Sequence, residues 1–261
     1  MGAWAERDAC LMAWPTRPAL WGPAFEAAKQ EYAAVARAIA AFEPVLMIAA
    51  PGLAEEARAA CGTGTGTGSG SGSGSGSGIE VIELPIDDSW LRDSGPVFTH
   101  DEHGARVGIE KVIWLPYGGL EDTETDGHVD GVAAYVGPAK VVVSLPEDPA
   151  HPDHARMRAN LAVLEASTDA RGRALEVVPV PQTTYGEVAG TRVEVGYLNF
   201  YLANGGCVVP VGGTPQDDAA LAVLAAALPG RTVVGVPTPV LAYGGGGIHC
   251  ITQQLPKEAR A

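Results

Sequence analysis

Short strand-like runs alternate with single helix-like runs along almost the whole chain. Residues 45–49 and 232–236 are β-branched or apolar runs that predict strands, whereas 27–42 and 153–167 carry apolar side chains at helical spacing. Further strands are expected at 79–86, 112–115, 132–135, 140–145, 175–180, 198–202 and 207–211, and further helices at 54–60 and 217–227. This order favours an α/β fold in which a ββαβ unit is repeated.

The composition fits one domain spanning residues 1–261. With 46% hydrophobic residues the chain can bury a full core, and no apolar run of roughly 18 residues predicts a membrane span. The first residues lack the basic start and apolar stretch of an export signal, which predicts a cytoplasmic protein. The scattered Cys10, Cys61, Cys207 and Cys250 predict free thiols and no metal site.

The chain is acidic, with a formal net charge of −14. Nucleic acid is therefore excluded as a partner, because contacts to phosphate groups need a basic surface. An acidic surface attracts cationic small molecules, although solubility alone explains the charge equally well.

Residues 62–78 form a low-complexity tract of glycine, threonine and serine. Such a sequence behaves as a flexible coil and predicts an expanded loop between a helix and a strand. A glycine-rich phosphate cradle would lead into a helix instead, so the loop is the favoured interpretation.

Four consecutive glycines, Gly244 to Gly247, precede Ile248, His249 and Cys250. Such a run gives up side-chain contacts, so it predicts room for something to approach the main chain closely. A thiol beside that opening predicts a sulfur nucleophile, and the alternative is a buried, inert thiol. We expect His249 to support the backbone, because neighbouring residues on an extended chain face opposite sides.

Two segments place carboxylates after predicted strands. They are DDSWLRDSGP at residues 87–96 and DTETDGHVD at residues 122–130. His128 and Asp130 lie two positions apart, so extended backbone would place them on one face. A carboxylate and an imidazole beside a thiol suit a planar cationic substrate, whose central carbon the sulfur can attack. A metal site is disfavoured, because these carboxylates lack a clear pattern of histidine partners.

The motifs GGGGIHCITQQ, DDSWLRDSGP, TDGHVD and YLNFYLANGG together resemble the agmatine deiminase family, which is related to the bacterial peptidylarginine deiminases. The resemblance runs from Met12 to Gln254. It implies a pseudosymmetric α/β propeller of ββαβ modules, of the pentein type, around a central site. It also implies hydrolysis of agmatine to N-carbamoylputrescine and ammonia, a step of polyamine and putrescine biosynthesis, without metal or organic cofactor. Agmatine is expected in preference to arginine or peptidyl-arginine, because the motifs match that branch most closely.

The resemblance also implies roles for the matching residues. Cys250 matches the nucleophile, and His128 matches the general acid and base. Asp93 and Asp130 match the carboxylates that hold the guanidinium group. Trp90 matches an aromatic residue lining the substrate slot, where it could contact a cation.

Further residues are expected near the substrate. Gly245 matches the place where the backbone approaches it. Asp87 and Asp88 could bind substrate or brace a turn. Asn199 and Asn204 could line the channel, although Asn204 also fits a hairpin turn before glycine.

The chain departs from the family pattern at the junction of residues 108 and 109. No Glu-Gly-Gly sequence occurs in the 261 residues, although the glutamate of that family motif contributes to guanidinium binding. About one internal module is therefore expected to be missing, and the exposed edges would favour a homo-oligomer. The alternatives to an active hydrolase are a remnant that only binds amines or partners and a cysteine protease, for which Cys250 lacks a recognisable signature.

Overall fold

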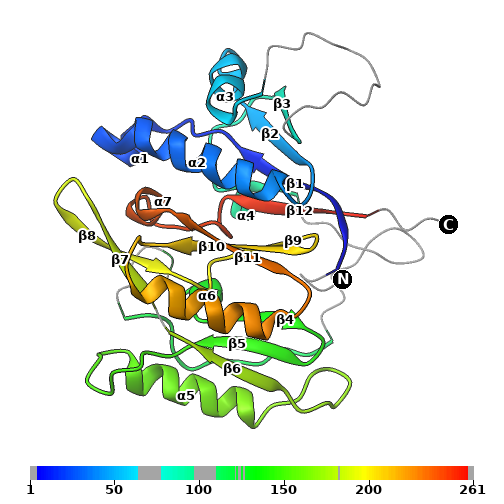
Figure 1. The fold of residues 1–261 in the computed structure, drawn as a ribbon, viewed down its shortest axis with the longest axis vertical. Helices are drawn as coiled ribbons and strands as arrows, with labels where there is room; N and C mark the ends of the chain where they lie inside the picture. Colours follow the sequence, from blue (N-terminus) through cyan, green and yellow to red (C-terminus); the bar gives the residue numbers. More distant parts are fainter. Residues whose placement is uncertain are drawn as a thin grey trace.

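The described residues form four small sheets, and three of them are stacked along the long axis of the molecule (Figure 1). This computed structural model describes residues 5–63, 78–96, 110–120, 122, 125, 127–181 and 183–257. Most of the glycine-rich tract and the junction at 108 and 109 lie outside the described residues.

One sheet, at the bottom of Figure 1, shows the repeat in its simplest form. β4 (Ala133–Gly137) and β5 (Lys140–Ser144) form an antiparallel hairpin, and α5 (His154–Glu165) connects them to β6 (Glu176–Val180). β6 lies parallel to β5, and Leu161 of α5 packs in the core beneath them. The order of elements is therefore ββαβ.

The same order recurs in the middle of the molecule. β9 (Tyr201–Ala203) and β10 (Gly206–Val211) are antiparallel, and α6 (Gln216–Ala227) leads to β11 (Thr232–Pro237), which is parallel to β10. Gly205 turns the chain between β9 and β10 with a φ of +73°, a conformation that favours glycine. The central strand, β10, is buried along its whole length.

The third unit combines elements from both halves of the sequence. β12 (Thr252–Pro256) pairs antiparallel with β1 (Arg7–Ala13), and α2 (Phe25–Ala40) connects β1 to the parallel strand β2 (Val45–Ala49). β3 (Ile79–Glu83) extends the sheet beside β2. This pairing fixes the loop that precedes β12 against the start of the chain.

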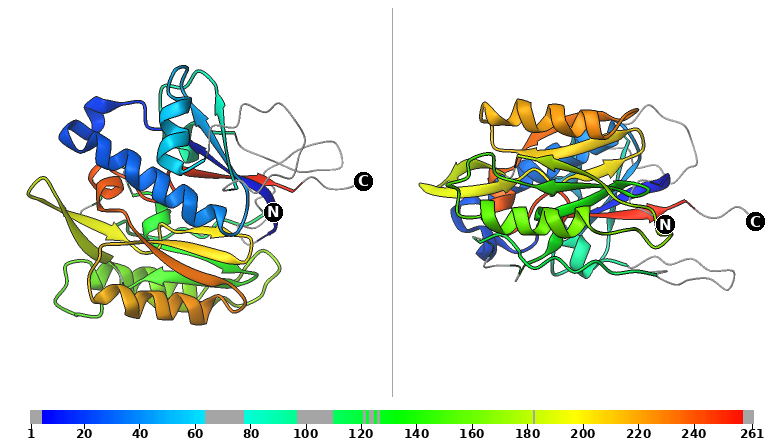
Figure 2. Two further views of the ribbon diagram at one scale, coloured as in Figure 1. Left: turned by 45° about the horizontal axis from the view of Figure 1, so that its top comes forward. Right: turned by 90° about the horizontal axis from the view of Figure 1, so that it is seen from below.

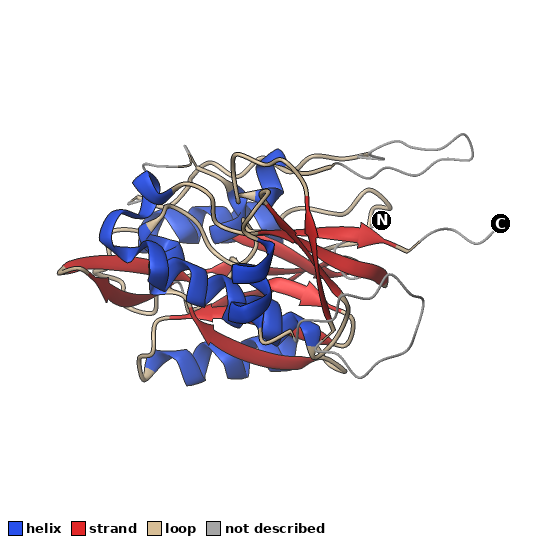
Figure 3. Cartoon of the chain, turned by 90° about the horizontal axis from the view of Figure 1, so that it is seen from above, coloured by secondary structure: helices blue, strands red, loops and turns tan. Residues whose placement is uncertain are grey.

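Shorter elements connect these units, and Figure 3 shows helices flanking the strands on more than one side. β7 and β8 form a separate antiparallel pair, and α7 packs against both. The bounds are α1 (Pro18–Trp21), the 3₁₀ helix η1 (Gly22–Ala24), α3 (Ala54–Cys61), α4 (Leu91–Ser94), the 3₁₀ helix η2 (Val129–Gly131), β7 (Thr183–Val188), β8 (Thr191–Gly196) and α7 (Pro239–Tyr243). Among the described residues, no helix has the length and apolarity that a bilayer crossing requires.

Helix α2 packs between the β12–β1–β2–β3 sheet and the β9–β10–β11 sheet (Figure 2). It contacts β2 and β3 on one side and β10 and β11 on another. Its buried residues are Ala28, Lys29, Tyr32, Ala33, Val35, Ala36 and Ile39. The small alanines let sheets approach the helix from several directions, which explains its alanine-rich sequence.

The predicted ββαβ repeat is confirmed, but several predicted bounds are not. The strand expected at 112–115 is wrong, because residues 110–120 contain no strand and Trp114 is 84% exposed. β3 ends at Glu83 because Pro85 cannot donate to a ladder. β9 begins at Tyr201, later than expected, because Leu198 lies in a turn and Asn199 in a bend. β1, β7, β8, β12 and α7 are additional to the predicted elements.

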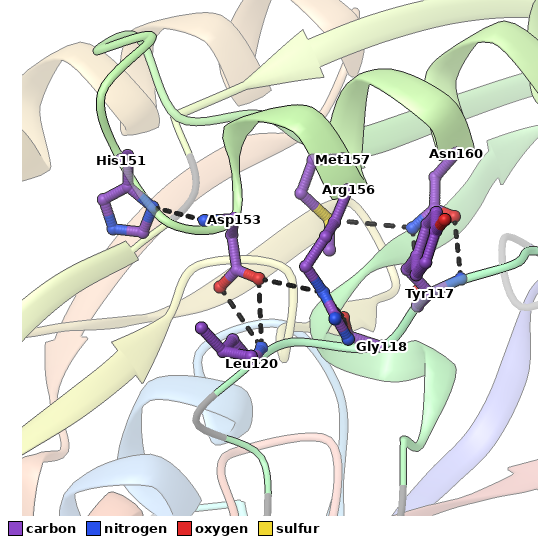
Figure 4. A network of polar contacts seen from close by, with 8 residues as sticks. All are labelled: Tyr117, Gly118, Leu120, His151, Asp153, Arg156, Met157 and Asn160. Atoms are coloured by element: carbon purple, nitrogen blue, oxygen red, sulfur yellow. Dashed lines mark hydrogen bonds and ion pairs between the residues drawn. The ribbon is translucent and has the colours of Figure 1, made fainter.

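Side chains of helix α5 hold the backbone of residues 117–120, a segment without helix or strand (Figure 4). The carboxamide of Asn160 donates to the carbonyl of Tyr117 at 2.8 Å and accepts from its N–H at 3.2 Å. Asn160 therefore pairs with this backbone much as a neighbouring strand would, and its side chain is fully buried.

Two charged side chains at the start of α5 extend this clamp. Asp153 accepts from the N–H of Leu120 at 3.0 Å, and Arg156 donates to the carbonyl of Gly118 at 3.2 Å. The loop closes on itself, since a Cβ on Gly118 would lie 2.9 Å from the Cα of Gly127. The backbone that leads into His128 is thus fixed from α5.

We expect Asn160→Leu to lower the free energy of unfolding by about 1–2 kcal/mol, because both polar groups of Tyr117 would lose their partner. Urea unfolding measures this change. The matched control is Arg158→Ala, an exposed position on the same helix, where a change below about 0.5 kcal/mol is expected. Equal effects of the two substitutions would contradict the clamp.

Candidate active site

Cys250 follows the glycine run and lies just before β12. Cys250 is 8% exposed and lines a cavity of about 530 Å³. His128, Asp130 and Gly245 line the same cavity. The structure therefore brings together four of the residues predicted from the sequence.

The glycine run mainly makes room for side chains of the protein itself. A Cβ on Gly244 would overlap the ring of Trp21, and a Cβ on Gly246 would lie 2.5 Å from the ring of Trp90. The predicted room for a close approach to the main chain is therefore present, and at these two glycines the approaching groups are side chains of the protein. Gly245 best fits the approach of another molecule, because its φ is +93° and it lines the cavity.

Asp130, Asn199 and Cys250 form a hydrogen-bonded cluster at the cavity. The carboxamide of Asn199 donates to Asp130 Oδ2 at 2.6 Å, and the Cys250 thiol donates to the same oxygen at 3.3 Å. Asn199 Nδ2 also lies 3.4 Å from the sulfur, and Asn199 Oδ1 accepts from the N–H of His249 at 2.8 Å. Asn199 therefore connects Asp130 with the loop that carries Cys250, in addition to the expected lining of the channel.

His128 and Asp130 reach the cavity from different backbone than the sequence predicts. Asp130 lies in the 3₁₀ helix η2, and His128 is the exposed residue before it. A tight helical turn, rather than an extended chain, therefore brings the imidazole and the carboxylate to one cavity.

The other predicted carboxylates are not among the cavity-lining residues. Asp87 and Asp93 are exposed. Asp88 pairs with Arg17 at 3.0 Å and accepts from the N–H of Ser89 at 2.7 Å, which fits the alternative that it braces a turn. Substrate contacts of these three aspartates stay predictions.

Trp90 and Asn204 also lie away from the cavity lining. The ring of Trp90 packs on Trp21 with centroids 5.6 Å apart. Asn204 accepts from the N–H of Arg7 at 3.1 Å and donates to its carbonyl at 2.8 Å. Asn204 thus joins the β9–β10 turn to β1, while its predicted substrate contact stays a prediction.

Arg92, which the sequence did not single out, holds the backbone around the nucleophile. Its N–H donates to the carbonyl of Cys250 at 3.0 Å, and its guanidinium donates to the carbonyl of His249 at 3.3 Å. The same guanidinium donates to the side chains of Gln253 and Gln254 at 2.5 and 2.8 Å. The arginine of DDSWLRDSGP thereby meets the end of GGGGIHCITQQ, so only contact between two motifs reveals its role.

The two side chains at the end of the loop are neutral at physiological pH. Burial, helped by Arg92, lowers the pKa of His249 to about 4. The imidazole also hydrogen-bonds to the backbone of Phe200, which agrees with the predicted backbone support. Burial, followed by the nearby Asp130 carboxylate, raises the pKa of Cys250 from 9.0 to about 12. The Cys250 thiol therefore carries its proton until something offsets that negative charge.

No group of three or more His, Cys, Asp or Glu side chains in the described part of the chain is placed to hold a metal ion. All four cysteines are free and buried. The cavity therefore offers a thiol, a carboxylate, a carboxamide and an imidazole, which suit nucleophilic attack and proton transfer.

We expect the Cys250 thiolate to be absent near neutral pH and to appear only as the pH rises well above 9.0, the usual thiol value. The thiolate absorbance of wild type minus Cys250→Ala measures this titration. Asp130→Asn should shift it to lower pH, because the neighbouring negative charge is removed. A thiolate already formed near pH 7 in wild type would contradict this electrostatic description.

The comparisons with known proteins agree with this geometry. The model of the Porphyromonas-type peptidyl-arginine deiminase family matches residues 1–107 and 101–256. The agmatine deiminases of Pseudomonas aeruginosa and Pseudomonas fluorescens are 30% and 29% identical, over 99% and 97% of this chain and 95% and 94% of theirs.

A solved structure of agmatine deiminase from Enterococcus faecalis resembles this fold with a TM-score of 0.82. The likeness covers 98% of this chain and 95% of that one, at 22% identity, and bears on the fold alone. The sequence matches show more than the likeness of fold, because they extend over both the segment with His128 and Asp130 and the segment with Cys250. The chain belongs to the Porphyromonas-type peptidyl-arginine deiminase family.

Proposed function

We propose that this protein hydrolyses the guanidinium group of agmatine, giving N-carbamoylputrescine and ammonia. The observation that carries the proposal is the meeting of Cys250, His128 and Asp130 at one cavity. Family membership and relatives named agmatine deiminase support it. The proposal places the reaction in polyamine and putrescine biosynthesis in the cytoplasm.

The reaction would begin when Asp130 binds the guanidinium N–H groups. The arriving positive charge offsets the carboxylate and favours transfer of the thiol proton to His128. Cys250 Sγ then bonds to the guanidinium carbon, and His128 protonates the nitrogen that leaves as ammonia. His128 next takes a proton from water, whose oxygen attacks the amidino-thioether. The C–S bond breaks, and the urea-type product leaves.

The remaining charged groups of the cavity favour a substrate that is positive at both ends. Asp122 and Glu194 line the cavity together with Asp130, whereas Arg192 is the basic residue among its described lining. The guanidinium of Arg192 lies over the ring of Tyr185, 3.5 Å from its centroid. Three carboxylates against one guanidinium suit agmatine better than arginine, whose own carboxylate would be repelled.

We also propose that the fold is a pentein-type propeller that lacks about one ββαβ module. The three ββαβ units support the repeat. The alignment with the Pseudomonas aeruginosa relative runs over 364 positions, although this chain has 261 residues. The two segments matched by the family model overlap at 101–107, next to the expected junction.

Exposed apolar residues after the junction also support a missing neighbour. Large hydrophobic side chains cluster there in the sequence, and their exposures include 57% for Val112, 84% for Trp114 and 50% for Leu120. A further module would cover such side chains, and in its absence they favour self-association. We propose a homo-oligomer on this basis.

The second candidate is a catalytically impaired family member that still binds amines. It is favoured by the missing Glu-Gly-Gly sequence and by the exposed position of Asp93, which together leave Asp130 as the one predicted guanidinium carboxylate at the cavity. A charged hydrogen bond contributes about 1.5–3 kcal/mol, so each missing carboxylate weakens the grip on the substrate.

Ammonia release from agmatine by the purified protein tests the two candidates. We expect turnover by wild type and a loss of at least about 1,000-fold in Cys250→Ala, because the nucleophile is removed. Arginine is the comparison substrate and should react more slowly. A folded wild type without turnover would favour the impaired member, and equal rates for both proteins would sink the proposed mechanism.

Restoring the absent segment tests the missing module. We expect insertion of the corresponding Pseudomonas aeruginosa segment between residues 108 and 109 to raise kcat/KM by roughly tenfold or more, because a charged hydrogen bond returns. The matched control carries glutamine in place of the glutamate of Glu-Gly-Gly. An insertion that folds but leaves both kcat/KM and self-association unchanged would count against the proposal.

A further inference from the structure

Helix α7 is capped by a side chain from another helix. Thr238 occupies its N-cap position, where threonine usually accepts from the first free N–H groups, but its side chain makes no such bond. Glu31 of α2 takes that role. Its two oxygens accept from the N–H of Val240 at 2.9 Å and of Leu241 at 2.7 Å.

Because Glu31 caps the helix, the Thr238 hydroxyl makes no capping hydrogen bond. Thr238 is 1% exposed, and within the described chain its buried Oγ1 has no hydrogen-bond partner. An unpaired hydroxyl that is shielded from water destabilises the fold, so such groups are rare. A valine of the same shape would avoid that cost.

Thr238 lies on the wall of the cavity that contains Cys250. It lines the cavity together with Ala242, Tyr243 and Gly245, which follow it along α7 and into the glycine run. The N–H of Ala242 donates to the carbonyl of Thr238 at 3.2 Å, so the helix fixes the threonine relative to the loop. Thr238 and Cys250 therefore line the same cavity, and the Thr238 hydroxyl is shielded just behind the lining.

We propose that Thr238 is a substrate-contacting residue whose hydroxyl accepts a hydrogen bond from an N–H of the cationic substrate. Rotation about the Cα–Cβ bond would turn the hydroxyl toward the bound molecule. A guanidinium offers donors and no acceptor, and a hydroxyl has two acceptor lone pairs. A substrate N–H would thus provide the hydrogen-bond partner that the Thr238 hydroxyl lacks within the described protein. The inference rests on the proposed cationic substrate.

Binding of agmatine to Cys250→Ala, which cannot turn it over, isolates this contact. We expect the Kd measured by calorimetry to rise roughly tenfold when Thr238→Val is added, because a hydrogen bond to a charged group is lost. Thr238→Ser keeps the hydroxyl and should stay within about threefold of Cys250→Ala. Without agmatine, Thr238→Val should raise Tm, since an unpaired buried hydroxyl is removed.

Thr252 provides the matched control for the thermal measurement. It is also fully buried, but its hydroxyl donates to the carbonyl of Ile248 at 2.8 Å. Thr252→Val should therefore lower Tm, opposite in sign to Thr238→Val. A rise for Thr238→Val together with weaker binding supports the inference, because a purely structural hydroxyl would lower Tm and leave the Kd unchanged.

Two results would overturn the inference, and they are distinguishable. If Cys250→Ala binds agmatine and the added Thr238→Val leaves the Kd unchanged, the contact is absent while the proposed function stands. If folded Cys250→Ala does not bind agmatine at all, the proposed function fails and the contact fails with it.

Discussion

The carboxamide of Asn199 ties the loop that carries Cys250 to the segment that carries Asp130. It donates to the carboxylate at 2.6 Å and accepts from the N–H of His249 at 2.8 Å. Neither segment is a strand, so no ladder fixes their separation. One half-buried amide therefore sets the distance between the Cys250 thiol and the Asp130 carboxylate, and the proposed chemistry depends on that distance.

The same device recurs around the cavity, where side chains from regular elements hold irregular backbone. Asn160 of α5 pairs with the backbone that leads to His128, Arg92 of α4 holds the carbonyl groups beside Cys250, and Glu31 of α2 caps α7. Loops that converge on a site need such bonds because their polar groups lack helical or sheet partners. Helix α5 belongs to the β4–β5–β6 unit and α2 to the β12–β1–β2 unit, and α4 packs against β12 and β1, so two of the ββαβ units hold the irregular backbone of the site.

Sequence patterns here predict which residues carry reactive groups better than they predict which distant segments lie in contact. Cys250, His128 and Asp130 were recognisable because their residue types and motifs indicate a reaction, and the ββαβ repeat followed from local periodicity. The part of Asn199 and Arg92 depends on contacts between motifs that lie far apart along the chain, which no local pattern contains. The run at 112–115 has strand-like residues, but a strand also needs a neighbour, and Trp114 is left largely exposed.

The charge on the substrate decides which reactions this cavity can perform. Asp130 and burial keep the Cys250 thiol protonated, so a neutral peptide bond would meet a poor nucleophile. In the proposed reaction a guanidinium would bring the positive charge that offsets Asp130, so binding and activation of the thiol would be one event. A cysteine protease would need an imidazole that keeps the thiolate formed, yet His249, the adjacent histidine, has a pKa of about 4 and supports the backbone. The arrangement therefore favours the proposed attack on a cationic amidine carbon over attack on a neutral carbonyl group.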